Sequence, residues 1–169
     1  MANLIRKQNV IDTNKRSLIK TIFISDGSTN EANTVLIDAG SLAFAMNANN
    51  MIMGSATDRK VNYRTTVKRI VGDCTSSNGI VKIQWSGDSN SEIILFGKTH
   101  RIQYDFDSMG DGAVISNPEA NATGNILIST AGFMAGEGFN LFLDLRKDGR
   151  DHDSGQTADP VAFNKIGIP

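Results

Sequence analysis

Short segments in which apolar and polar residues alternate recur throughout residues 17–147, and turn-forming residues separate one segment from the next. Segment 80–86, IVKIQWS, shows the pattern, because Val81, Ile83 and Trp85 fall on one side of an extended chain. Successive side chains of a strand point to opposite faces, so each such segment has one face to bury. A chain dominated by this pattern is expected to fold as paired sheets around a shared apolar interior.

The same alternation, or a short apolar run, predicts roughly nine or ten strands. They cover residues 17–24, 33–38, 41–46, 61–72, 80–86, 92–96, 101–106, 113–116, 125–130 and 139–147. Recurring hairpin signals such as Asn78–Gly79 favour antiparallel sheets. No stretch of about 12 residues has a clean helical period, which argues against an α/β fold. We therefore predict an all-β protein, an antiparallel β-sandwich or jelly roll with extended N- and C-terminal arms.

The longest alternation lies in residues 61–72, VNYRTTVKRIVG, where the threonines and valines favour a strand over a helix. One face is expected to carry Val61, Tyr63, Thr65, Val67, Arg69 and Val71. The opposite face would carry Asn62, Arg64, Thr66 and Lys68. The basic residues could contact nucleic acid. A single stripe with one aromatic is more typical of a solvated face, or of one docked on an acidic neighbour.

Length, charge and cysteine content narrow the class of protein further. A chain of 169 residues fits one domain. With 17 basic and 18 acidic residues, the net charge is −1, so the overall field does not attract nucleic acid. Cys74 is the only cysteine, which excludes an intrachain disulfide. Because neither a membrane span nor a signal peptide is recognisable, we expect use in a reducing cytoplasm or in a particle assembled there.

The two ends differ in composition from the middle, and we predict three parts: an N-terminal arm (1–16), a β-sandwich domain (17–147) and a C-terminal arm (148–169). The arms carry charge balances of 4 − 1 = +3 and 2 − 4 = −2. Each holds too few apolar residues to fold alone, so a neighbouring subunit is expected to hold it. The residues predicted to contact such a partner are Arg6, Lys7, Arg16, Asp148, Arg150, Asp151, Asp153 and Phe163. Phe163 is the expected anchor, because a lone aromatic in a polar arm suits a partner's pocket.

Residue types that carry catalysis or hold cofactors are sparse. Asp148, Asp151 and Asp153 could ligate calcium, but no Glu closes the loop as it does in an EF-hand. A solvated or partner-bound arm is therefore the favoured interpretation. His152 lies beside two of these aspartates, without a Gly-x-Ser-x-Gly segment that would supply a nucleophile. We predict no enzymatic activity, no cofactor and no metal.

Four segments resemble those of a known group of proteins: YRTTVKRI (63–70), QWSGD (84–88), ISNPEANATGNI (115–126) and LFLDLRKDGRDHDSGQTADPVAFN (141–164). They look like segments of small virion structural proteins of marine tailed bacteriophages, cyanophage-like ones in particular. The similarity runs over most of the chain. It implies a β-sandwich or jelly-roll subunit with extended termini, which sits on or between capsid proteins and has no catalytic residues.

The leading hypothesis is a capsid decoration or cement protein that bridges major capsid subunits in the virion. Its partners would be the major capsid protein and copies of itself, without direct contact to nucleic acid or membrane. One alternative is a neck or tail component that forms a ring by heterologous contacts. Another is a carbohydrate-binding sandwich, which needs Trp85 or Tyr104 exposed on a concave face. Trp85 is expected in the core instead, because it shares a side with Val81 and Ile83.

Overall fold

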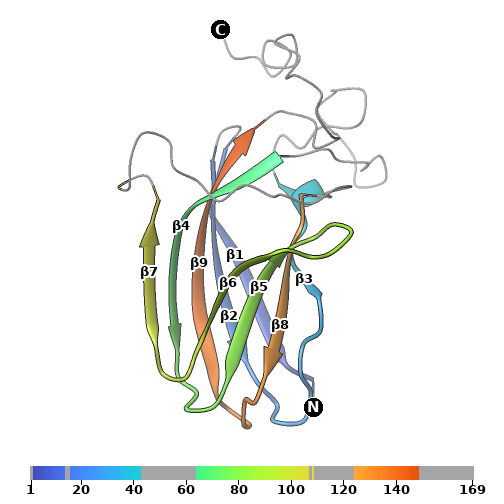
Figure 1. Cartoon of the computed structure of the whole chain (residues 1–169), viewed down its shortest axis with the longest axis vertical. Helices are drawn as coiled ribbons and strands as arrows, with labels where there is room; N and C mark the ends of the chain where they lie inside the picture. The colour runs from blue at the N-terminus through green and yellow to red at the C-terminus, as the bar shows by residue number, and fades with distance from the viewer. Residues whose placement is uncertain (1, 14–15, 43–63, 107, 109–123, 149–169) are drawn as a thin grey trace, which may run out of the picture.

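The computed structural model describes residues 2–13, 16–42, 64–106, 108 and 124–148, and most of these residues lie in β-strands (Figure 1). The strands are β1 (Leu4–Asp12), β2 (Arg16–Ile24), β3 (Thr34–Ile37), β4 (Arg64–Cys74), β5 (Ile80–Trp85), β6 (Glu92–Gly97), β7 (Arg101–Asp105), β8 (Ile126–Ala131) and β9 (Gly138–Asp148). A 3-10 turn, η1 (Ala39–Ser41), follows β3. The Asp38 carboxylate caps η1 by accepting from the Gly40 N–H.

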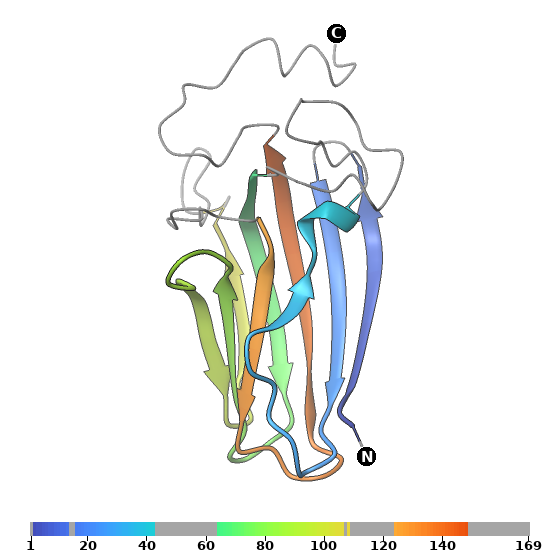
Figure 2. The same cartoon turned by 90° about the vertical axis from the view of Figure 1, so that its right-hand side faces the viewer.

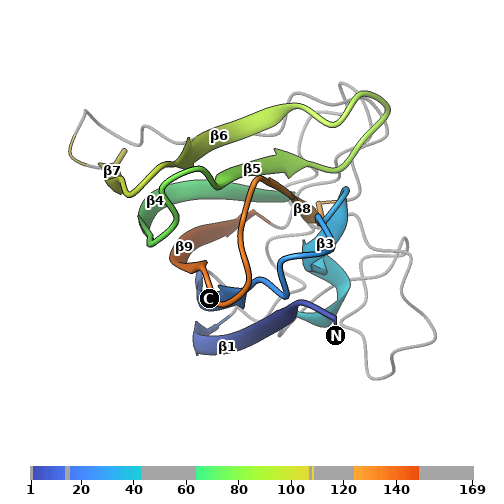
Figure 3. The same cartoon turned by 90° about the horizontal axis from the view of Figure 1, so that it is seen from below.

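The strands form two sheets that pack face to face, as the side view and the view from below show (Figures 2 and 3). One sheet has five strands in the order β1-β2-β9-β4-β7, and the other has four in the order β3-β8-β5-β6. Every ladder between the described strands is antiparallel. These sheets confirm the prediction of an all-β antiparallel sandwich.

Four of the ladders are nested within one another along the chain. Strand β2 pairs with β9, β3 with β8, β4 with β7 and β5 with β6. The strands β2 to β9 are therefore paired as one long hairpin would be, with its tip between β5 and β6. Successive pairs alternate between the five-stranded and the four-stranded sheet, so the hairpin is wrapped around the core.

Side chains from the inner faces of both sheets fill the space between them. Trp85 is fully buried, and Val81 and Ile83 are buried beside it on β5, as predicted. Phe23 of β2 stacks on Phe139 of β9, with ring centroids 5.1 Å apart. The other large side chains that are fully buried are Leu36, Ile70, Ile126, Ile128, Leu141, Leu143 and Leu145. Each contributes roughly 1.5–3 kcal/mol, so this interior is the main source of stability.

The predicted face assignment is wrong in the second half of β4. Alternation placed Arg69 and Val71 on the same face as Val67. The register against β9 shifts between Val67 and Arg69, and one extra residue turns the rest of the strand over. Val67 and Ile70 are therefore buried between the sheets. Arg69 lies exposed on the outer face, with half-buried Val71 two residues further on.

The prediction of an N-terminal arm over residues 1–16 is also corrected by the structure. Residues 4–12 form β1, which pairs along β2 from Leu4 opposite Ile24 to Asp12 opposite Ser17. This segment is thus held within its own subunit by its ladder with β2. Most β1 side chains are exposed, because β1 is an edge strand, so the segment shows no apolar face in the sequence.

The C-terminal end of the sandwich lies close to the boundary predicted for it. Strand β9 runs to Asp148, and residues 149–169 of the predicted C-terminal arm lie outside the described residues. The predicted strand at 113–116 and most of the one at 41–46 lie outside them as well. The remaining predicted strands coincide with β2 to β9 to within a few residues.

Gly138, at the start of β9, has no room for a side chain. A Cβ there would lie 2.0 Å from the carbonyl oxygen of Phe23 on the paired strand, which is backbone and cannot rotate away. We expect Gly138→Ala to lower the midpoint of urea unfolding more than Gly136→Ala does. Gly136 has a positive φ, 82°, and nothing lies within 4 Å of its position for a Cβ, so its substitution carries only the conformational cost of about 1–2 kcal/mol. Equal midpoints for the two variants would contradict this packing.

Candidate interaction surface

Three of the residues predicted to contact a partner lie in the first two strands of the sandwich. Arg6 is exposed on the outer face of β1, opposite Ile22 of β2. Lys7 points toward the other sheet, and its Nζ donates to the Val35 carbonyl oxygen at 3.3 Å. Arg16 begins β2 and is bonded to Asp144 of β9. Of these three, Arg6 and Arg16 face outward from the five-stranded sheet, whereas Lys7 bridges the two sheets.

The other predicted contact residues belong to the C-terminal part. Asp148 is the last residue of β9 and lies opposite Arg64 in the β4–β9 ladder. Arg150, Asp151, Asp153 and Phe163 lie outside the described residues.

The outer face of the five-stranded sheet carries a depression that we call the cationic groove. Two adjoining cavities of about 260 and 390 Å³ form it, and they share Val71 and Phe142. Three half-buried apolar side chains make its floor: Leu18, Val71 and Phe142. Four basic side chains surround them: Arg16, Lys20, Arg69 and Arg101. The groove thus crosses four neighbouring strands, β2, β9, β4 and β7.

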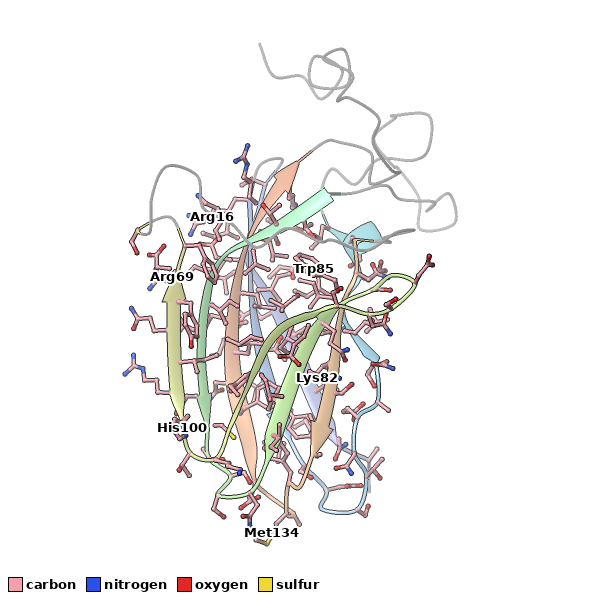
Figure 4. The ribbon with its side chains drawn as sticks, viewed as in Figure 1. Arg16, Arg69, Lys82, Trp85, His100 and Met134 are labelled. Atoms are coloured by element: carbon pink, nitrogen blue, oxygen red, sulfur yellow. The ribbon has the colours of Figure 1, made fainter. Side chains whose placement is uncertain are left out.

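Arg16 and Arg69 mark one end of the cationic groove, at the end of the molecule away from Met134 (Figure 4). Arg16 holds Asp144 with two hydrogen bonds, from Nε to Oδ1 at 2.7 Å and from Nη2 to Oδ2 at 2.6 Å. The carboxylate side chain is only 9% exposed, whereas the guanidinium side chain is 47% exposed. This bidentate pairing fixes the orientation of Arg16 and leaves much of its side chain in solvent.

Lys20 occupies the middle of the cationic groove. Its Nζ lies 5.7 Å from the centroid of the Phe142 ring, which is within the range of a cation–π contact. Its cross-strand neighbours are Gln8 on β1 and Phe142 on β9, so no carboxylate is opposite it in either ladder. The Lys20 ammonium therefore places a positive charge beside the apolar floor of the groove.

The balance of charge in the cationic groove differs from that of the whole chain. Among the described side chains that line it, four are basic and two, Asp73 and Asp144, are acidic, which gives 4 − 2 = +2. The whole chain has a net charge of −1. Strict alternation along residues 61–72 does not predict this groove, because it places Arg69 and Val71 on the inner face with Val67. The bulge in β4 is what places both beside Phe142.

Other candidate residues have simpler surroundings. Trp85 is completely buried, so its ring cannot stack on a sugar at the surface. Tyr104 is 42% exposed, and its ring lies parallel to that of Phe106 with centroids 6.2 Å apart. His100 is exposed, and its Nδ1 lies 2.9 Å from the Lys98 carbonyl oxygen. The described residues contain no group of three or more side chains arranged to hold a metal ion.

Comparisons with known proteins identify no family for this chain. No family model, no curated protein and no solved structure matches it. Within the described part of the chain, no helix has the length and apolar character needed to cross a bilayer.

Proposed function

We propose that this chain is a structural protein of a phage virion, namely a capsid decoration or cement protein that bridges major capsid subunits. The observation that carries the proposal is the nested pairing of β2 to β9, with successive pairs alternating between two sheets. We interpret this connectivity as a jelly roll, with β1 added at one edge. Jelly rolls are a recurrent architecture of viral capsid and lectin domains.

A fold hosts many functions, so the proposal also draws on sequence and surface. Segments 63–70, 84–88, 115–126 and 141–164 resemble those of virion structural proteins. The cationic groove offers a wide, charged surface on one side of a rigid sandwich. A subunit of this kind can attach to an assembled shell without changing its own fold.

The proposed mechanism is stabilisation by binding to the assembled state. A protein that binds the closed shell and not the separated subunits shifts the equilibrium toward the shell by mass action. Many copies on one shell act together, because opening a joint then breaks several contacts at once. The proposed partners are the major capsid protein and further copies of this chain, and the proposed location is the virion.

Particle composition tests this proposal. We expect virions of the phage that encodes the chain to contain hundreds of copies, measured by quantitative mass spectrometry against the major capsid protein. Particles assembled without the chain are expected to release DNA at a lower temperature than complete particles, measured with a DNA-binding dye. Virions that contain none of this chain would refute the proposal. A copy number of tens or fewer would favour the alternative within the virion, in which the chain is a component of the neck or tail.

A carbohydrate-binding module is the second candidate, and one observation favours it. The parallel rings of Tyr104 and Phe106, with Tyr104 42% exposed, offer an aromatic surface at the edge strand β7. We expect Tyr104→Ala to lower the free energy of unfolding only by the small contribution of a partly exposed side chain. Binding to a glycan array that disappears in this variant, with the fold intact by circular dichroism, would favour the carbohydrate role over the virion role.

A further inference from the structure

We infer that the cationic groove binds an acidic, extended segment of a partner protein, and this inference rests on the proposed role as an assembly subunit. The groove combines two features that together select such a ligand. Its floor of Leu18, Val71 and Phe142 is apolar and half-buried, and its surrounding side chains carry a net charge of +2. An acidic segment with apolar side chains matches both features, whereas a purely ionic ligand matches only the second.

The position of Lys20 argues against a nucleic-acid ligand. Sequence-tolerant binding of single strands depends on bases stacking on exposed aromatic faces. The Phe142 ring is the only aromatic side chain described in the cationic groove, and the Lys20 ammonium lies 5.7 Å from its centroid. A base would have to displace this ammonium in order to stack. A carboxylate can instead approach the ammonium from solvent while a neighbouring apolar side chain contacts the ring edge.

The ligand is expected to be extended because the basic side chains of the cationic groove are spread over two adjoining cavities. It spans the full width from β2 to β7, and its basic side chains come from three different strands: Arg16 and Lys20 from β2, Arg69 from β4 and Arg101 from β7. A compact anion would contact only one or two of these side chains. An extended chain laid over both cavities can pair several carboxylates with them in turn.

A pair of lysines offers a matched test. Lys20 and Lys82 are both half-buried in mid-strand on the outer face of their sheets, but only Lys20 lines the cationic groove. Lys82 lies opposite Leu95 of β6 and Ser129 of β8, on the four-stranded sheet (Figure 4). Lys20→Glu and Lys82→Glu make the same change in net charge on opposite sides of the molecule.

The probe is a fluorescein-labelled ten-residue peptide of alternating Glu and Leu, and fluorescence anisotropy measures its binding to the full-length chain. We expect Lys20→Glu to weaken binding at least tenfold and Lys82→Glu to change it less than twofold. A peptide of alternating Glu and Ser should bind several-fold more weakly, because it lacks groups for the apolar floor. Raising the salt from about 0.1 M to about 1 M should also weaken binding, since the Debye length falls from roughly 10 to 3 Å.

Several results would overturn the inference. Equal losses in the two lysine variants would show that the peptide follows overall charge and not the cationic groove. Tighter binding of a ten-nucleotide single strand would assign the groove to nucleic acid. Concentration-dependent self-association that Lys20→Glu abolishes would assign it to a second copy of the chain. If Lys20→Glu binds virions at full copy number, the virion role stands and the groove has no part in it.

Discussion

Asp12→Ala is expected to lower the free energy of unfolding by about 3–5 kcal/mol, although the carboxylate lies near the surface at the end of an edge strand. The reason is Lys147, whose side chain is 0% exposed and whose ammonium donates to the Asp12 carboxylate and, at 2.7 Å, to the Thr13 carbonyl oxygen. Without Asp12, a buried positive charge loses its carboxylate partner. A neutral Lys147 would limit the cost, because the side chain can release its proton to escape an unfavourable charge.

Urea unfolding followed by circular dichroism measures this effect, and the double variant Asp12→Ala/Lys147→Met is the control. Methionine keeps most of the volume of lysine and needs no charged partner, so the double variant should recover much of the lost stability. If the double variant is as unstable as Asp12→Ala alone, the loss comes from the edge strand itself and not from the buried ammonium.

Burial also gives this ion pair a characteristic pH dependence. Desolvation lowers the pKa of Lys147 below its usual 10.5, and the hydrogen bond and charge of Asp12 only partly oppose that shift. The folded chain therefore releases the proton before the unfolded chain does. Below the lowered pKa both states hold the proton, and the folded state bears the full cost of burying a charged Lys147. Between that pKa and 10.5 only the unfolded state holds the proton, so the unfolding free energy rises with pH. The rise should be absent from Lys147→Met, measured as the difference between the two unfolding curves.

Trp85→Ala is expected to cost about 3–5 kcal/mol, because a fully buried aromatic side chain is replaced by a cavity. Trp85 lies at the end of β5 between the sheets, and its Nε1 has no hydrogen-bond partner among the described residues. Trp85→Phe should therefore cost less than the change in volume alone suggests, since it removes an unsatisfied donor while it leaves a smaller void. Leu95→Ala, at a side chain that is 53% exposed, should change stability by less than about 0.5 kcal/mol.

Thermal unfolding by calorimetry orders these three variants. Retention of wild-type stability in Trp85→Ala would mean that the two sheets close over the void, which the dense packing around Ile83 and Ile126 argues against. Exposure of Trp85 in solution would appear as a red-shifted fluorescence maximum. Such a shift would contradict the burial and would reopen the carbohydrate candidate.

Regular alternation made much of the fold predictable from the sequence. One face of β5 is wholly apolar, and one face of β9 is apolar as far as Leu145, so Val81, Ile83, Leu141, Leu143 and Leu145 could be assigned to the core from spacing alone. The edge strand β1 gives no such signal. Its side chains are mostly exposed on both faces. Its pairing with β2 is made by backbone hydrogen bonds, which do not depend on the type of side chain and so leave no pattern in the sequence.

The cationic groove could not be predicted for a different reason. Its basic and apolar residues come from four strands, β2, β9, β4 and β7, that are neighbours in the folded sheet but far apart in the sequence. The bulge after Val67 then reverses the faces of Arg69 and Val71. One extra residue in a ladder is set by packing against the partner strand, and no local pattern marks it.

The nested ladders set the order in which this chain can become stable. Strand β9 is the last of the described strands to be synthesised, yet it is the central strand of the five-stranded sheet and pairs with β2 and β4 on its two sides. The contact between Arg16 and Asp144, for example, joins positions 128 residues apart in sequence. Such a high contact order slows folding, because the entropy of closing long loops is lost before the distant contacts form. The nascent chain therefore holds unpaired strands until β9 has been synthesised, and truncation before β9 should give an insoluble product.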